Sequence, residues 1–156
     1  MRRQTVREGL RAGFVAAAAS AGALWEFGRV RGQPLEPINA IAHTLIGSRA
    51  FFVTEWQPSV TLTALVIHTI SVCAWGVVIA LLVPKLRGGR LLLAVVLCSA
   101  AIYGLETNLL PEGLRPGFER ILTPREVGVV YFAFALALTA VLHHDRRSSP
   151  DPLPGD

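Results

Sequence analysis

Charged residues are scarce in this chain, and several long stretches lack them entirely. Only 17% of the 156 residues are Asp, Glu, Lys or Arg, and 52% are hydrophobic. A typical soluble domain carries about 25% charged residues. The charge that is present collects in short segments between the apolar stretches. This pattern disfavours a water-soluble domain and is typical of helices in lipid that are joined by hydrated loops.

Cysteine and lysine are also rare. The two cysteines, Cys73 and Cys98, lie inside apolar stretches and form neither a metal-binding spacing nor a disulfide framework. The basic residues are 14 arginines and a single lysine, and they flank the apolar stretches. Positive charge in that position sets membrane topology and contacts lipid headgroups. We therefore expect the lipid bilayer as a partner, and no nucleic acid.

Four stretches are long and apolar enough to predict transmembrane helices. They cover about residues 10–27, 60–83, 91–110 and 124–142. The last one starts at Thr123, Pro124 and Glu126, which is the pattern of a capping box with proline at the first helical position. The sequence therefore predicts an all-α membrane protein, in which residues 1–142 form a single domain of four transmembrane helices.

The remaining segments are predicted to lie at the membrane surface or beyond it. Residues 28–59 are too polar to cross a bilayer, but their apolar residues recur near the period of a helix. This predicts a short interfacial or re-entrant helix between the first and second spans. Residues 143–156 are rich in Ser, Pro and Asp and are predicted to form a disordered cytoplasmic tail.

The first apolar stretch has two interpretations. It follows four arginines, and Ala19-Ser20-Ala21 resembles the cleavage site of a secretory signal peptide. Signal peptide cores favour leucine, whereas this stretch has small residues at helical spacing, which let a second helix approach closely. These small residues are Gly9, Gly13, Ala17 and Ala21. We therefore favour a packed transmembrane helix.

Basic residues are unevenly divided between the two sides of the predicted bundle. Nine lie on the side of both termini and the 84–90 turn, and six lie in the longer 28–59 and 111–126 segments. The positive-inside rule assigns the richer side to the cytoplasm. We therefore expect a multi-pass protein of the bacterial cytoplasmic (inner) membrane with both termini cytoplasmic.

Polar side chains in or beside the predicted spans are candidate site residues, because ionisable groups are costly in lipid. The candidates are Glu26, Asn39, His43, His68, Ser71 and Glu106. At about 1.5 Å per residue, both glutamates and His68 fall in the outer half of the bilayer. The 28–59 segment, with His43, lies at the same surface. We expect an outward-facing pocket in which the His43 and His68 side chains approach each other.

This pocket has a functional and a structural interpretation. Two imidazoles and two carboxylates are able to hold a divalent metal ion, but His43 and His68 match no metal motif. The chain has no nucleophile elbow, HExxH or phosphate loop, so no catalytic residue is assigned and an enzyme is the less favoured interpretation. The sequence does not identify a cofactor. In the structural interpretation each polar group bonds to a neighbour, for example Glu106 to Arg115.

Two segments resemble a group of small, uncharacterised bacterial membrane proteins with four helices. The first, 37–43, contains the pattern Asn-Ala-x-x-His, and the second, 66–71, contains His-x-x-Ser. The resemblance covers about residues 10–83. It implies the four-helix fold and highlights Asn39, His43 and His68, and it implies no activity. The abundance of Ala, Gly and Arg beside a single Lys also fits a bacterial source.

Two classes of function remain. The favoured prediction is a structural or accessory role in the inner membrane, as part of a homo-oligomer or a larger membrane complex. The alternative is binding or transport of a proton, metal ion or small solute through the outward-facing His/Glu pocket. The inner parts of two spans, 73–83 and 91–98, contain no acidic or basic residue and no histidine, which argues against a transport path through a monomer.

Overall fold

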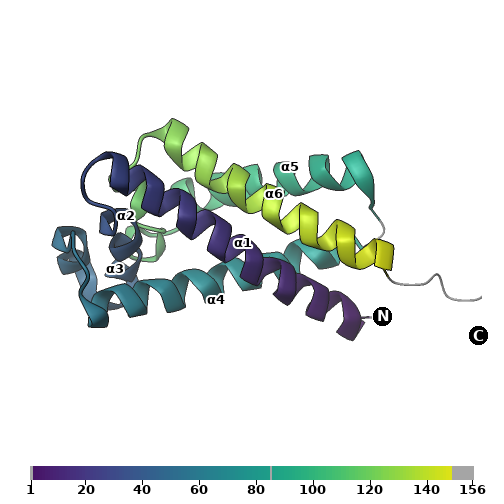
Figure 1. Cartoon of the computed structure of the whole chain (residues 1–156), viewed down its shortest axis with the longest axis horizontal. Coiled ribbons are helices and arrows are strands. Elements are labelled where there is room, and N and C mark those ends of the chain that lie inside the picture. The colour runs from purple at the N-terminus through teal and green to yellow at the C-terminus, as the bar shows by residue number, and fades with distance from the viewer. Residues whose placement is uncertain (1, 85, 149–156) are drawn as a thin grey trace, which may run out of the picture.

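The structure, a computed structural model, describes residues 2–84 and 86–148 as a bundle of four long helices (Figure 1). The long helices are α1 (Arg2–Val30), α4 (Pro58–Leu82), α5 (Gly88–Asn108) and α6 (Pro124–Ser148). Between α1 and α4 lie the short turns α2 (Glu36–Asn39), η1 (Ala40–Ala42), α3 (His43–Ile46) and η2 (Gly47–Phe52). Between α5 and α6 lie η3 (Glu112–Leu114) and η4 (Phe118–Arg120). No strand occurs in the described ranges, which confirms the predicted all-α class.

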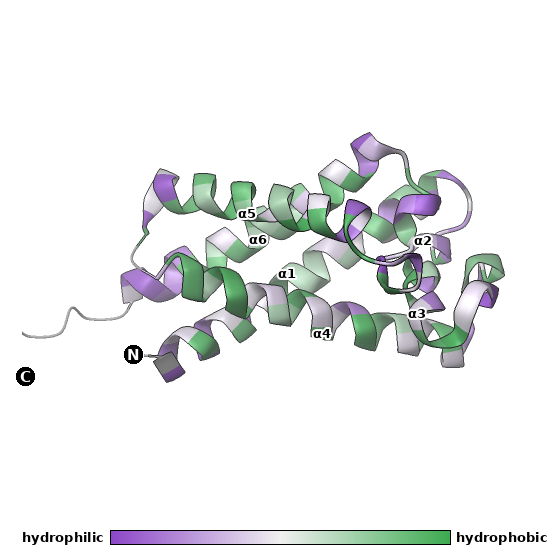
Figure 2. Cartoon of the chain, turned by 180° about the vertical axis from the view of Figure 1, so that it is seen from behind, coloured by the Kyte–Doolittle hydropathy of each residue, from purple (hydrophilic) through white to green (hydrophobic). Residues whose placement is uncertain are grey.

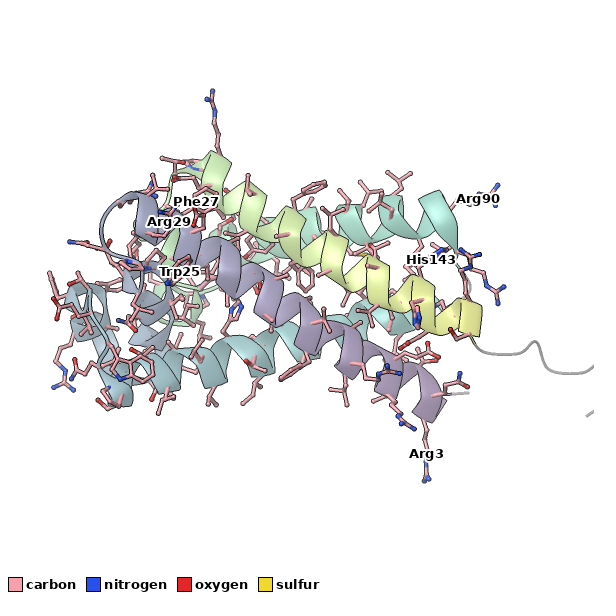
Figure 3. The ribbon with its side chains drawn as sticks, viewed as in Figure 1. Arg3, Trp25, Phe27, Arg29, Arg90 and His143 are labelled. Atoms are coloured by element: carbon pink, nitrogen blue, oxygen red, sulfur yellow. The ribbon has the colours of Figure 1, made fainter. Side chains whose placement is uncertain are left out.

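Consecutive long helices run in opposite directions, so the bundle has two different ends (Figure 1). The start of α1, the end of α6 and the α4–α5 turn share one end, which we call the terminal end. The connections 31–57 and 109–123 form the loop end. Arg3, Arg90 and His143 lie at the terminal end, and Trp25 and Arg29 lie at the loop end (Figure 3). Hydrophilic residues gather at both ends, with hydrophobic residues between them (Figure 2).

Three of the four predicted spans have the length and composition of a membrane helix. These are α4, α5 and α6. Helix α1 is longer than any of them, but it is not apolar enough to qualify. Its middle is built largely from alanine and glycine, and arginines and glutamates occupy both of its ends. The prediction of a helical membrane protein is therefore supported, with three candidate spans where the sequence predicted four.

The small-residue ridge of α1 is its contact surface with α4, as predicted. A Cβ atom on Gly13 would lie 2.7 Å from the Cα of Cys73. On the opposite helix, a Cβ on Gly76 would lie 2.6 Å from the carbonyl oxygen of Gly9. Both distances are too short for any side chain, so glycine is required where these two backbones meet. Helix α1 therefore lies against α4 on one side and against α6 on another.

The buried side chains form two separate clusters along the bundle. The terminal cluster lies toward the terminal end and combines small and aliphatic residues from all four long helices. Its members include Ala12, Ala16, Ile79, Ala80, Leu91, Val95, Leu138 and Leu142. The loop cluster lies toward the loop end and draws on the connecting turns as well. Its members include Leu24, Ile38, Ile41, Val60, Phe118 and Val127.

The start of α6 is fixed as the sequence predicts. The backbone N–H of Thr123 donates to Glu126 Oε2 at 2.8 Å, and the N–H of Glu126 lies 3.4 Å from Thr123 Oγ1, which completes the capping box. Glu126 also accepts a 2.5 Å hydrogen bond from Arg31, and this bond raises the pKa of the Arg31 guanidinium. The end of α1 is thereby fastened to the start of α6.

Two predicted boundaries are corrected. The single interfacial helix expected in 28–59 is a series of short turns, because Gly47 takes a positive φ of 74° and ends α3 after one turn. Residues 143–148, which were predicted to belong to a disordered tail, continue α6. There the Arg146 side chain is buried and donates to the Leu86 carbonyl at 2.8 Å. Residues 149–156 lie outside the described part of the chain.

Candidate functional site

A cavity of about 400 Å³ lies between the terminal cluster and the loop cluster. Helix α1 packs on α4 and α6, and α5 packs on α6, whereas α4 and α5 stand apart (Figure 2). The cavity fills the space between α4 and α5 and is closed at the back by α1 and α6. Its lining is mostly apolar, with a few polar side chains. This size and composition are those of a small-molecule site.

Three of the six candidate residues line this cavity: His68, Ser71 and Glu106. The other three do not. Glu26 is exposed on α1 and pairs with Arg29 at 2.6 Å, because α1 continues one turn past its predicted end. Asn39 and His43 are buried within the connection between α1 and α4. The structure therefore replaces the predicted six-residue pocket by a smaller polar group with different partners.

His68 joins α4 to α1 through one ring nitrogen. Its Nε2 lies 3.0 Å from Ser20 Oγ and 3.2 Å from the Ala17 carbonyl oxygen, while Ser20 Oγ itself donates to the Ala16 carbonyl at 2.8 Å. A carbonyl only accepts hydrogen bonds, so Nε2 carries the proton in the neutral ring. Nδ1 then carries the lone pair. It has no partner among the described residues and is not enclosed, so it faces the cavity.

This hydrogen bonding also defines what Ser20 does. A serine nucleophile gives its proton to an unprotonated histidine nitrogen. Here the serine hydroxyl proton is directed to Ala16, and the facing histidine nitrogen is itself a donor. The Ser20–His68 pair therefore links two helices.

Glu106 is held by two neutral donors from other helices. The indole N–H of Trp75 donates to Oε1 at 2.8 Å, and the Tyr131 hydroxyl donates to Oε2. The pairing of Glu106 with Arg115 that the sequence suggested is not formed. Arg115 lines the same cavity, and its Nε donates to the Leu110 carbonyl at 3.0 Å. Tyr131 was not identified from the sequence, because a tyrosine among apolar residues looks like a core residue.

A second carboxylate lies behind this group. Glu119 is close enough to act electrostatically on both Glu106 and Tyr131. Its Oε2 is enclosed by protein and has no hydrogen-bond partner within the described ranges. Enclosed carboxylate oxygens without a donor are costly. Glu106, the acidic residue of the lining, therefore has a second carboxylate as its electrostatic neighbour.

Asn39 has a structural role that its burial makes plain. Its side-chain amide donates to the carbonyls of Val53 and Glu55 at 2.9 and 3.0 Å, and its oxygen accepts from Thr61 at 2.8 Å. Both amide N–H groups and the amide oxygen are therefore used to hold the segment that leads into α4.

His43 ties the two connections of the loop end together. Its Nδ1 lies 2.9 Å from the Ala40 carbonyl, and its Nε2 lies 3.2 Å from the Glu112 carbonyl. Each ring nitrogen thus faces a backbone carbonyl oxygen, and a neutral ring donates to one of the two. The ring packs on Phe51. Gly117 is required here, because a Cβ at that position would lie 2.7 Å from His43 Nδ1.

The described residues offer no group of three metal-ligating side chains. The two weak metal candidates, His43 and His68, bond to different partners, and no hydrogen bond or ring contact joins them. The expected approach of these two histidines is therefore not formed. The cavity is instead an apolar chamber with one imidazole acceptor, one bonded carboxylate and one arginine.

Comparison with family models, with curated proteins and with solved structures gives no match for this chain. The broad class that the sequence and the structure together support is a small helical membrane protein.

Proposed function

We propose that this chain is a four-helix membrane protein whose cavity binds a small amphiphilic molecule taken from the bilayer. The observation that carries the proposal is the cavity itself. It is about 400 Å³ in volume, is lined by apolar side chains from both core clusters, and contains a few polar groups from α4, α5 and α6. Ligand sites typically combine an apolar wall with a small number of placed polar groups.

The opening of the cavity favours entry from lipid. Ser71 is an exposed residue of α4 that lines the cavity, and it lies roughly 20 Å along the helix from Pro58, at about 1.5 Å per residue. Leu45 and Leu114, which are 74% and 62% exposed, line the part nearer the loop end. An opening that extends this far along an apolar helix faces the bilayer as well as its surface.

Helix α1 is included as the fourth span because of the face it presents outward. Between Arg11 and Glu26 its exposed residues are all without a polar side chain. They are Phe14, Val15, Ala18, Gly22 and Trp25. The buried alanines Ala12, Ala16 and Ala17 and the glycine Gly13 instead lie on the buried side of the helix. The low hydropathy of α1 therefore reflects its buried side, and a helix in lipid is judged by its exposed side.

The proposed orientation in the membrane follows from the uneven division of basic residues between the two ends of the bundle. The richer terminal end is assigned to the cytoplasm, so the cavity, which lies toward the loop end, belongs to the outer half of a bacterial inner membrane. The accessory role receives less support, because the glycine ridge that would contact a partner is already occupied by α4. Transport also receives less support, because the terminal cluster closes the bundle below the cavity.

The proposal is tested with Trp75 as a fluorescent reporter. Trp25 and Trp56 are replaced by phenylalanine, and the protein is reconstituted in phosphatidylcholine vesicles. Titration with 6-bromohexan-1-ol, whose bromine quenches indole fluorescence, is expected to give saturable quenching. Ser71→Phe fills the opening and should remove the saturable part. Ile70→Phe, at the neighbouring lipid-facing position, is the matched control and should keep it.

Two outcomes would contradict the proposal. Linear quenching without saturation would mean that the reagent meets Trp75 only by partitioning into lipid. Equal saturable quenching in the Ser71→Phe and Ile70→Phe proteins would place the binding site elsewhere.

A further inference from the structure

An ionised Glu106 would have no balancing cation within the described part of the chain. Its two oxygens accept from an indole and a phenol, which are neutral donors. No cation of the described residues pairs with it, and the nearby charged group is a second carboxylate, Glu119. Because an acidic group in a membrane protein requires a counter-charge or a proton, this wall favours a positively charged occupant.

A second acceptor faces the same space from α4. The Nδ1 atom of His68 carries a lone pair, since its other nitrogen is the donor to Ala17. His68 is only 8% exposed, and its Nδ1 is not among the enclosed polar atoms that lack a hydrogen-bond partner in the described part of the chain. An ammonium N–H is a donor that suits both this nitrogen and the Glu106 carboxylate.

Aromatic rings supply the rest of the lining near these acceptors. Trp75, Phe118 and Tyr131 all line the cavity, and the rings of Phe118 and Tyr131 lie 6.4 Å apart between centroids. Aromatic faces attract organic cations and also accept an alkyl chain. The acidic group, the acceptor nitrogen and the aromatic wall are observations separate from the volume of the cavity, on which the proposed binding function rests.

Arg115 is the one cation among the described residues of the lining, and its location indicates where in the cavity a charged ligand would bind. It belongs to the 109–123 connection, where its Nε is held by the Leu110 carbonyl. An anionic ligand at Arg115 would share the cavity with the Glu106 carboxylate, and Glu119 acts on Glu106 from outside the lining. An ammonium group beside Glu106 would lie next to a negative charge, and the positive charge of Arg115 would lie in the 109–123 connection.

We propose that the ligand of this cavity is a lipophilic amine, whose protonated nitrogen is bound by Glu106 with His68 Nδ1 as a second acceptor and with its alkyl part between the aromatic residues. This inference rests on the proposed binding function and adds the chemical class of the ligand. It also gives Glu106 a role that hydrogen bonding to Trp75 and Tyr131 alone does not require.

The test uses three probes of equal chain length in the Trp75 reporter protein. Hexylammonium, 1-hexanol and hexanoate each compete with 6-bromohexan-1-ol at neutral pH. Hexylammonium is expected to compete at a concentration at least about tenfold lower than hexanol, which is the scale of a partly buried charge pair with an aromatic contribution. Hexanoate is expected to be the weakest of the three.

Two substitutions locate the effect. Glu106→Gln keeps the shape and an acceptor for Trp75 but removes the charge, so it should abolish the preference for hexylammonium while hexanol competes as before. Glu26→Gln, which removes an exposed carboxylate outside the cavity, should leave the preference unchanged. Glu119→Gln provides a second variant in case Glu106→Gln does not fold, and it should reduce the preference. Because the same probes are used with every variant, differences in their partitioning cancel when the preference is compared between proteins.

The possible failures are distinguishable. Absence of saturable quenching would overturn the binding function and this inference together. Saturable quenching with hexanol or hexanoate competing at or below the hexylammonium concentration would overturn the amine class alone. The amine class would likewise be wrong if Glu106→Gln kept the full preference.

Discussion

The terminal half of the bundle is filled by small and aliphatic side chains, whereas the loop half surrounds a cavity with polar walls. In the terminal half, α1 and α4 meet glycine to glycine, and Ile79, Leu91 and Leu138 are fully enclosed. In the loop half, α4 and α5 separate, and turns from both connections reach into the space between them. The same four helices thus pack closely at one end and leave room at the other.

The two halves of the bundle differ in the size of the side chains at the interface between α1 and α4. Close approach of α1 and α4 needs a glycine on each helix at the contact, and Gly13 and Gly76 supply it. Further along the same interface the contact passes from glycine to Ser20 and His68, whose side chains hold the helices through a hydrogen bond instead. The α1–α4 interface therefore changes from a backbone contact at the glycines to a side-chain hydrogen bond at the level of the cavity.

The largest effect concerns the two ends themselves. If they face opposite sides of a membrane, a reporter fused after Arg147 should be active only as a cytoplasmic reporter. A reporter fused at Gly113, in the 109–123 connection, should be active only on the outer side. The result is all-or-none, because the two positions are separated by a single span, α6. Matching reporter activity at both positions would mean that α6 does not cross the membrane.

The close contact in the terminal half gives the next largest effect. Gly13→Leu places a side chain where even a Cβ would lie 2.7 Å from the Cα of Cys73, so α1 must move away from α4. We expect a loss of about 3 kcal/mol in stability, at the upper end for overpacking. Gly22→Leu on the same helix is the control, because the space around Gly22 is open. Thermal unfolding in detergent measures both, and equal stabilities would show that the contact is not required.

Asn39 tests the loop half in the same way. Asn39→Leu keeps the number of side-chain heavy atoms but leaves the carbonyls of Val53 and Glu55 without a donor in a buried position. We expect a loss of about 2 kcal/mol, since each buried unsatisfied group costs about 1–3 kcal/mol. Asn108→Leu, at an exposed position of α5, should change stability little. Unchanged stability of the Asn39→Leu variant would mean that the Asn39 amide does not fix the connection between α1 and α4.

The smallest effect is the coupling between Ser20 and His68. A double-mutant cycle with Ser20→Ala and His68→Phe isolates the hydrogen bond between α1 and α4. Hydrogen bonds between membrane helices average about 0.6 kcal/mol, so we expect a coupling of that order. A coupling of zero would show that the bond does not hold the two helices at the cavity, and that another contact sets their separation.

Helix positions and local contacts could be predicted from the sequence to different degrees. The α6 capping box and the α1 ridge were predicted correctly, because both depend on residues a few positions apart. The depth argument correctly singled out His68 and Glu106 as polar residues that line one cavity. It failed for Glu26, because it could not show that α1 extends to Val30 and offers Arg29 as a partner.

The partners of these residues could not be predicted, because they depend on tertiary packing. Ser20 and Tyr131 lie within apolar stretches and look like ordinary core positions until another helix brings His68 or Glu106 to them. Asn39 and His43 were expected to face a pocket. The turns around Gly47 direct them into the connections instead, where backbone carbonyls take up their hydrogen bonds.

The glycine contact of α1 with α4 also bears on how the chain is made. Helix α1 leaves the ribosome before α4, yet its composition gives it little free energy of insertion into lipid by itself. Its glycines find a matching surface only after Cys73 and Gly76 have been synthesised. Under the proposed topology, stable insertion of α1 is therefore a property of a helical pair. The quality of that late pairing, more than the hydropathy of α1, would decide whether a newly made chain is retained or degraded.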